Sequence, residues 1–167
     1  EDCLEKQWFK FNIKFQDQHK LFQKLKYPYQ TVNSLKFYNK IQSKLNKNTQ
    51  IKLNSNIKKI KKNIDIFEIE TENNIIKSKI VFDSRVPKIN PGSLYQHFYG
   101  YEIITTESHF NDNSVTLMDF DCEQKDGVHF FYILPFAKNR ALIETTWLSY
   151  LNILDKKNYI KELSSYI

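Results

Sequence analysis

Residues 130–149 read FFYILPFAKNRALIETTWLS and contain the strongest information about the fold. Phe130 to Leu134 and Ala141 to Thr146 are apolar runs typical of buried strands, and the basic segment Pro135 to Arg140 predicts the turn between them. The second run contains a single carboxylate, Glu144. A carboxylate in apolar surroundings either finds a partner or has a raised pKa and keeps its proton. Glu144 is therefore a candidate acid, although a strand glutamate pointing outward to solvent fits the same pattern.

The residues before this hairpin predict further strands and one helix. Phe9 to Phe15 alternate apolar and polar side chains, as in a half-buried strand. Ser34 is placed to cap a helix whose apolar positions continue to Leu45. Further strands are expected at Tyr27–Val32, Thr49–Leu53, Asn56–Ile60, Ile64–Thr71, Ile75–Phe82, Tyr95–Thr105 and Ser114–Asp121.

Several short segments predict where these elements end. Asp126-Gly127 is typical of a hairpin turn, and Asp155 is a candidate N-cap for a final helix. Pro87, Pro91 and Gly92 interrupt the chain and predict a boundary. Since strands, a helix, a meander and an antiparallel set follow one another, the sequence predicts an α+β fold.

The net charge of +6 raises the question of an anionic partner. Of the 25 basic residues only two are arginines, Arg85 and Arg140. Proteins that recognise specific nucleic-acid sequences depend on arginine for bidentate and stacking contacts. Because arginine is so rare in this chain, we expect no nucleic-acid binding. Lysines spread along solvated faces are compatible with weak attraction to an anionic membrane surface.

The composition also indicates the cellular compartment and the kinds of site to expect. Cys3 and Cys122 lie far apart without metal spacing, which indicates a reducing compartment. The four histidines show no metal-binding arrangement, so no metal site is expected. No apolar run reaches about 18 residues, so no membrane span is expected. The chain starts at Glu1 and has its one methionine at Met118, which predicts a fragment of a longer protein.

Four sequence blocks resemble motifs of the lycopene cyclase family of carotenoid biosynthesis, in the same order. VFDSR, at Val81–Arg85, is similar to the family's Val-Ile-Asp-Ala-Arg-Gly flavin-contact segment. YQHFYGYE, at Tyr95–Glu102, is similar to Gln-x-Phe-x-Gly-(Trp/Gln)-Glu, and LMDF, at Leu117–Phe120, to a Met-Asp strand. Tyr132 to Pro135 and Leu142 to Thr146 resemble the Tyr-x-Leu-Pro and Leu-Ile-Glu-Asp-Thr motifs.

The resemblance covers roughly residues 8–150 and implies a domain organisation. The fold would combine part of an FAD/NAD(P)-binding domain with an antiparallel β-sheet substrate domain. Residues 1–33 would be crossover strands of the substrate domain, 34–88 a partial FAD-binding domain, 89–150 the substrate-domain sheet, and 151–167 the start of a following helix.

The resemblance also implies a function. Glu144 would be the acid that protonates an acyclic end of lycopene during cyclisation to the ionone rings of β-carotene. Reduced FAD would assist, with NADPH as a candidate reductant, and the enzyme would be cytoplasmic and peripheral to the membrane. Aromatic faces can stabilise a carbocation, and the candidate substrate-binding residues are Phe98, Tyr99, Tyr132 and Trp147.

The chain departs from the family in three ways. Asp83, Ser84 and Arg85 are the candidate FAD contacts, but Val86 stands where relatives usually carry glycine. With only three glycines the chain has no GxGxxG motif, so we expect that it does not retain FAD by itself. Thr145 stands where relatives have a second acid.

Two other functions fit parts of the sequence. One is another FAD-dependent oxidoreductase of the same superfamily, such as a prenyl reductase or hydroxylase. The other is a basic, β-rich module that binds an anionic membrane surface and loses that binding in salt.

Overall fold

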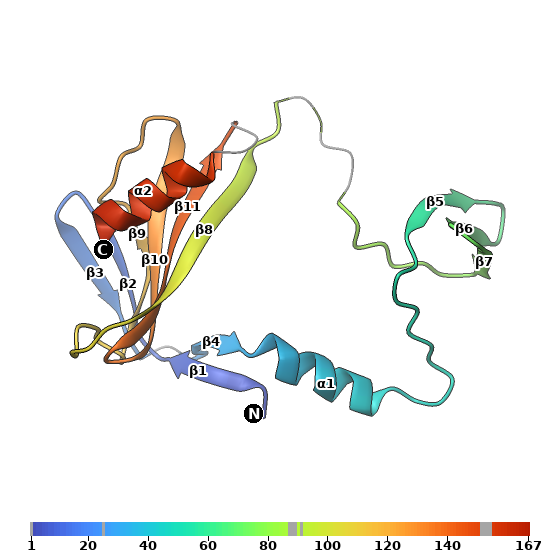
Figure 1. Cartoon of the computed structure of the whole chain (residues 1–167), viewed down its shortest axis with the longest axis horizontal. Helices are drawn as coiled ribbons and strands as arrows, with labels where there is room; N and C mark the ends of the chain where they lie inside the picture. The colour runs from blue at the N-terminus through green and yellow to red at the C-terminus, as the bar shows by residue number, and fades with distance from the viewer. Residues whose placement is uncertain (1, 25, 87–89, 91, 151–154) are drawn as a thin grey trace. The chain divides into compact units, whose positions relative to one another are not determined.

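The computed structural model of the chain describes residues 2–24, 26–86, 90, 92–150 and 155–167. The chain forms two compact units, one made of Glu1–Ile41 with Asn90–Ile167 and the other of Gln42–Ile89 (Figure 1). Within the described residues there are two helices and three sheets, which confirms the predicted α+β class.

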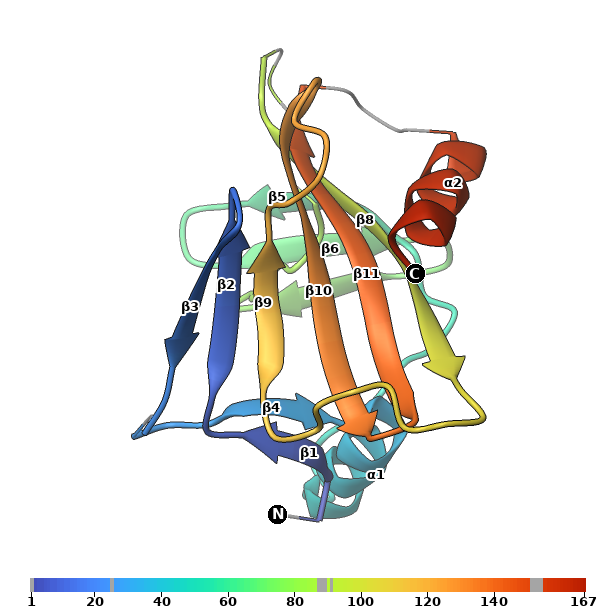
Figure 2. The ribbon, with the colours of Figure 1, turned by 90° about the vertical axis from the view of Figure 1, so that its left-hand side faces the viewer.

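The first unit contains a six-stranded sheet in the order β3-β2-β9-β10-β11-β8 (Figure 2). Neighbouring strands are antiparallel, except that β2 and β9 are parallel. The strands are β2 (Phe11–Phe15), β3 (Gln18–Phe22), β8 (Tyr95–Ile104), β9 (Val115–Asp119), β10 (Gly127–Ala137) and β11 (Arg140–Ser149).

A two-stranded ribbon and a helix cover opposite faces of this sheet. The ribbon pairs β1 (Leu4–Trp8) with β4 (Tyr29–Val32), and the helix is α2 (Lys156–Tyr166), which packs over β11 and β8. A further helix, α1 (Ser34–Lys44), follows β4, and its last three residues belong to the second unit.

The alternation of β-strand side chains divides the core of this unit into two clusters. On the α2 face, Phe131, Ala141 and Ile143 pack with Leu163 of the helix. On the opposite face, Trp8 of the ribbon packs with Val115, Leu134 and their neighbours. The middle of the sheet is therefore buried on both sides, which explains the nearly continuous apolar runs of β10 and β11.

The predicted hairpin of β10 and β11 is confirmed, but its turn is shorter than Pro135 to Arg140. Pro135 lies inside β10 opposite Ala141, and only Lys138 and Asn139 form the turn. A register shift between Pro135 and Ala137 marks a bulge, a position where a strand tolerates proline. The Pro135 carbonyl also accepts a hydrogen bond from the buried Trp8 indole, which keeps this segment in the sheet.

Both helices begin with a side-chain cap. Asp155 caps α2 as predicted, since its carboxylate accepts a hydrogen bond from the Lys157 backbone N–H. Ser34 was expected to cap α1, but it is the first helical residue. The cap is Asn33, whose side-chain oxygen accepts from Lys36 N–H at 3.0 Å.

The second unit is a three-stranded antiparallel sheet of β5 (Ile57–Lys62), β6 (Phe67–Thr71) and β7 (Ile75–Ser78). The strand predicted at Thr49–Leu53 is absent, because those residues are exposed and find no pairing strand. The strand predicted at Ile75–Phe82 ends at Ser78, whose hydroxyl bonds the backbone of Ile80 and so closes a turn.

The prolines of the predicted boundary, Pro87 and Pro91, lie outside the described residues, as does the domain limit expected between residues 88 and 89. Of the limit expected between residues 150 and 151, only Tyr150 is described. The assignment of these segments to FAD-binding and substrate domains stays a prediction.

Gly127 is required at the start of β10. Its φ is +153°, and an added Cβ would collide with the backbone carbonyl oxygen of Leu148. We expect Gly127→Ala to lower the free energy of unfolding by about 2 kcal/mol or more, measured by urea denaturation.

Gly92 provides the matched control. Its φ is +81°, but an added Cβ would meet no atom within 4 Å. Gly92→Ala should therefore cost only the backbone strain, about 1 kcal/mol. Equal losses in the two variants would contradict the steric role of Gly127.

Candidate functional site

Glu144 lies in the middle of β11, on the face opposite α2. Its cross-strand neighbours are Tyr132 of β10 and Gly100 of β8. The side chain is half-buried, and this burial raises the pKa of its carboxyl group. The Thr146 hydroxyl donates a hydrogen bond to Glu144 Oε1 at 3.0 Å and opposes part of that rise. The pKa direction is that of a carboxyl group that can act as an acid.

Two phenols lie close enough to Glu144 to feel its charge. Burial raises the pKa of Tyr29, in β4, and the charge of Glu144 raises it further. The pKa of Tyr132 is raised by burial first, then by Tyr29 and Glu144. Both phenols therefore stay protonated and neutral near Glu144. Sequence patterns could not identify Tyr29, because its approach depends on the β1–β4 ribbon.

A row of aromatic rings leads along this face toward Glu144. Ring centroids are 6.3 Å apart for Phe15 and Phe120, 5.5 Å for Phe120 and Phe130, and 5.2 Å for Phe130 and Tyr132. We call these four residues the aromatic row. It ends at Tyr132, directly across from Glu144. Within the row Phe130 is buried, whereas Phe15 is exposed.

The residues predicted to bind substrate divide between the two faces. Phe98 pairs with Thr146, and Tyr132 with Glu144, so both lie on the Glu144 face. Tyr99 and Trp147 occupy the other face, where Tyr99 stacks on Tyr159 of α2. A strand places successive residues on opposite faces, so these two side chains do not join Glu144.

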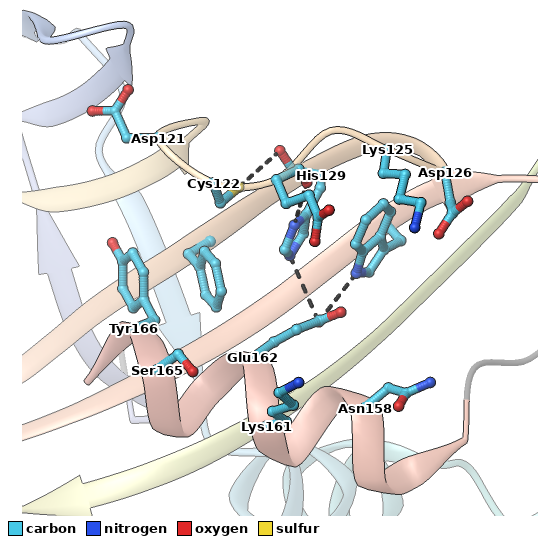
Figure 3. A pocket seen from close by; sticks show the side chains of 13 residues that line it. Asp121, Cys122, Lys125, Asp126, His129, Asn158, Lys161, Glu162, Ser165 and Tyr166 are labelled. Carbon is cyan, nitrogen blue, oxygen red and sulfur yellow. Dashed lines mark hydrogen bonds and ion pairs between the residues drawn. The ribbon is translucent and has the colours of Figure 1, made fainter.

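A polar cluster lies beneath α2, behind Glu144. Glu162 of α2 accepts hydrogen bonds from Thr145 Oγ1 at 2.8 Å and from the Trp147 indole at 3.2 Å. His129 Nε2 lies 2.8 Å from Thr145 Oγ1 and 3.7 Å from Glu162 Oε2. Figure 3 shows Glu162 projecting from the helix toward His129. These hydrogen bonds attach α2 to β11 at defined positions.

Two histidines on the α2 face of the sheet have a pKa below the ordinary value for histidine. Burial is the main cause for both His97 and His129, although the charge of Glu162 opposes it. His97 contacts Tyr159 and Ser149, while His129 Nδ1 contacts the Glu123 carbonyl at 2.9 Å. Both imidazoles are therefore favoured in the neutral form.

A cavity of about 580 Å³ opens between α2 and the loop before β10 (Figure 3). Its lining does not include Glu144. Burial raises the pKa of the lining thiol, Cys122, to about 12, so this group stays protonated. The lining residues are Asp121, Cys122, Glu123, Lys125, Asp126, His129, Phe131, Trp147, Asn158, Lys161, Glu162, Ser165 and Tyr166.

The predicted FAD contacts lie in the second unit, in an exposed segment. They do not follow a strand directly, because β7 ends at Ser78. Arg85 donates to both carboxylate oxygens of Asp83 at 2.9 Å and to the Ile57 carbonyl at 3.0 Å. This pairing holds the pKa of Asp83 at about 2. The Arg85 guanidinium is thus engaged inside the chain and Ser84 is exposed, and the role of these three residues as FAD contacts stays a prediction.

The described residues provide neither a candidate metal site nor a helix that could span a membrane. No group of three or more His, Cys, Asp or Glu side chains among them could hold a metal ion. Neither helix in that part of the chain is long and apolar enough for a membrane crossing, since each has 11 residues and a span needs about 20.

Comparisons with known proteins give one family and one fold. The family model described as "Lycopene cyclase protein" matches residues 1–167. The chain is similar to the protein in a crystal structure of halogenase PltM in complex with ethyl mercury and mercury, with a TM-score of 0.68 and 12% identity. The similarity covers 98% of this chain but only 39% of that protein, and at this identity it shows the fold alone. No curated protein matches the sequence.

The buried histidine makes stability depend on pH. Because the pKa of His129 is lower in the folded than in the unfolded chain, the unfolded chain takes up a proton first as the pH falls through about 6.5. The contribution of His129 to the free energy of unfolding is fully present above that pH and is lost as the pH falls below it. We expect the urea midpoint of the chain to fall between pH 7.5 and pH 5.5.

Two variants identify the group responsible. His129→Gln should reduce this pH dependence to the part contributed by His97, whose pKa is also lowered by burial, whereas His19→Gln, at an exposed position of β3, should leave it unchanged. An unaltered slope in the His129 variant would exclude this histidine as the origin.

Proposed function

Because the chain belongs to the lycopene cyclase family, we propose that it carries the catalytic acid of a carotenoid cyclase, and that this acid is Glu144. The family match confirms the resemblance seen in the sequence motifs. One observation carries the proposal: a half-buried carboxyl group with a raised pKa lies on a sheet face lined with aromatic rings.

The proposed reaction begins with proton transfer from Glu144 to the terminal double bond of lycopene. The π electrons of that bond form the new C–H bond and leave a tertiary carbocation. A neighbouring double bond attacks the cation and closes the ring, and loss of a ring proton to a base forms the double bond of the ionone. One proton is gained and one is lost, so no oxidant or reductant is consumed.

The neighbours of Glu144 suit a cationic intermediate on a hydrocarbon. Tyr132 presents a neutral ring directly across the strand pair, and Tyr29 adds a second phenol from the ribbon. Aromatic faces attract cations, by about 2 kcal/mol or more at desolvated sites. Phe15, Phe120 and Tyr132 of the aromatic row are at least partly accessible and would give the rest of the polyene an apolar surface, whereas Phe130 is buried. Phe98, exposed on the same face, is a further candidate contact, whereas Tyr99 and Trp147 support the sheet from behind.

A role for FAD, with NADPH as reductant, stays a prediction that the residues of this chain do not support on their own. The proposed protonation of lycopene and the stabilisation of the cation use Glu144 and its aromatic neighbours. Association with a membrane surface likewise stays a prediction.

Glu144→Gln tests the proposal in the complete enzyme. The amide can still accept the hydrogen bond of Thr146 but cannot supply the proton, so β-carotene formation from lycopene should fall by a factor of at least about 100. The flavin content should be unchanged.

Glu102→Gln is the matched control. Glu102 lies on the same sheet face in β8, but it is largely exposed and pairs with Arg140. Its variant should retain nearly full activity. Unchanged product formation by the Glu144 variant would rule out its role as the acid.

The cofactor prediction has a separate test. The purified 167-residue chain should show no stoichiometric flavin absorbance after incubation with excess FAD and gel filtration, because it lacks a glycine-rich phosphate loop. One flavin retained per chain would contradict this expectation.

A further inference from the structure

We propose that Thr146 is a positioning residue whose hydroxyl fixes one oxygen of the Glu144 carboxyl group, so that the other oxygen carries the transferable proton. This inference rests on the proposed function of Glu144 as the acid. It explains how a flexible glutamate side chain presents its proton in one direction.

Thr146 is built rigidly into the sheet. It is 0% exposed, and it pairs with Phe130 of β10 on one side and with Phe98 of β8 on the other. Two residues along β11 from Glu144, it shares the same face. A β-branched side chain in a packed strand has few accessible rotamers, so the position of its hydroxyl is set by the backbone.

The hydrogen bond makes the two carboxyl oxygens of Glu144 inequivalent. Thr146 Oγ1 donates to Oε1 at 3.0 Å, and no side chain or backbone group of the described residues donates to Oε2. In a neutral carboxyl group the carbonyl oxygen is the better acceptor, so Thr146 favours the carbonyl at Oε1 and the O–H at Oε2. The proton is thereby left on the oxygen that has no partner within the sheet.

The neighbours of the Glu144 carboxyl group are a glycine and two neutral phenols. On β8, the residue opposite Glu144 is Gly100, where an added Cβ would crowd Glu144 Cβ at 3.3 Å, so the glycine lets β8 pack closely against Glu144. The titratable groups whose pKa shifts record the charge of Glu144 are Tyr29 of β4 and Tyr132 of β10, both neutral phenols. With burial raising the pKa of Glu144, the Thr146 bond limits that rise.

Thr145 offers a close comparison. It is also a fully buried threonine of β11, but its hydroxyl donates to Glu162 on the opposite face. Removal of the Thr145 hydroxyl disturbs the strand and α2 without touching the Glu144 carboxyl group. It therefore separates a loss of stability from a loss of proton positioning.

The test uses the complete enzyme and measures kcat and KM for lycopene across pH. Thr146→Val should lower kcat about tenfold with KM within about twofold, and should move the basic limb of the kcat profile to higher pH, because the lost bond stabilised the carboxylate. Thr146→Ser should restore both quantities. Thr145→Val should leave the basic limb unchanged. Thr146→Ala, which also lacks the hydroxyl, replaces the valine variant if circular dichroism shows that the latter does not fold.

The outcomes distinguish the positioning role of Thr146 from the proposed role of Glu144 as the acid. If Glu144→Gln abolishes cyclisation but a folded Thr146→Val has the wild-type kcat and pH profile, the role of Thr146 is overturned while Glu144 remains the acid. Failure of serine to restore kcat would also overturn it. If Glu144→Gln is fully active, the proposed function itself fails.

Discussion

The alternation of side chains along β11 is the constraint on which the site depends. This strand pairs with β10 on one side and β8 on the other over its whole length. Glu144 and Thr146 point to the aromatic face, while Thr145 and Trp147 point to α2. A slip of one residue would exchange the two sets. It would place Glu144 beneath the helix, beside Glu162, and would put Thr145 at the end of the aromatic row.

The polar cluster beneath α2 secures this register from behind. Apolar contacts alone tolerate small shifts, whereas the Glu162 carboxylate must meet both the Thr145 hydroxyl and the Trp147 indole. The cluster also explains why threonine suits position 145, where the family resemblance led us to expect a second acid. A carboxylate there would lie close to the Glu162 carboxylate, and two neighbouring negative charges disfavour each other's ionisation.

Sequence patterns predicted most of the strands and one cap, because these depend on local periodicity, but they missed β1 and β3 and wrongly placed a strand at Thr49–Leu53. The two faces of β11 were also implicit in the sequence, since Trp147 is three residues from Glu144 and must point the other way. The positions of Tyr99 and Tyr29 could not be predicted from local patterns. They depend on long-range strand pairing, of β8 with β11 for Tyr99 and of β1 with β4 for Tyr29. Pro135 in β10 was missed because its environment depends on Trp8, which is 127 residues away in sequence.

The partial burial of Glu144 suits its proposed role as an acid, which must recover its proton in every turnover. A fully buried, unpartnered carboxyl group would hold its proton too strongly to release it to a double bond. An exposed one would be ionised near neutral pH and have no proton to give. Here burial raises the pKa while the Thr146 bond stabilises the carboxylate left after transfer. Both opposing effects on the pKa of Glu144 are set by one strand and its neighbours.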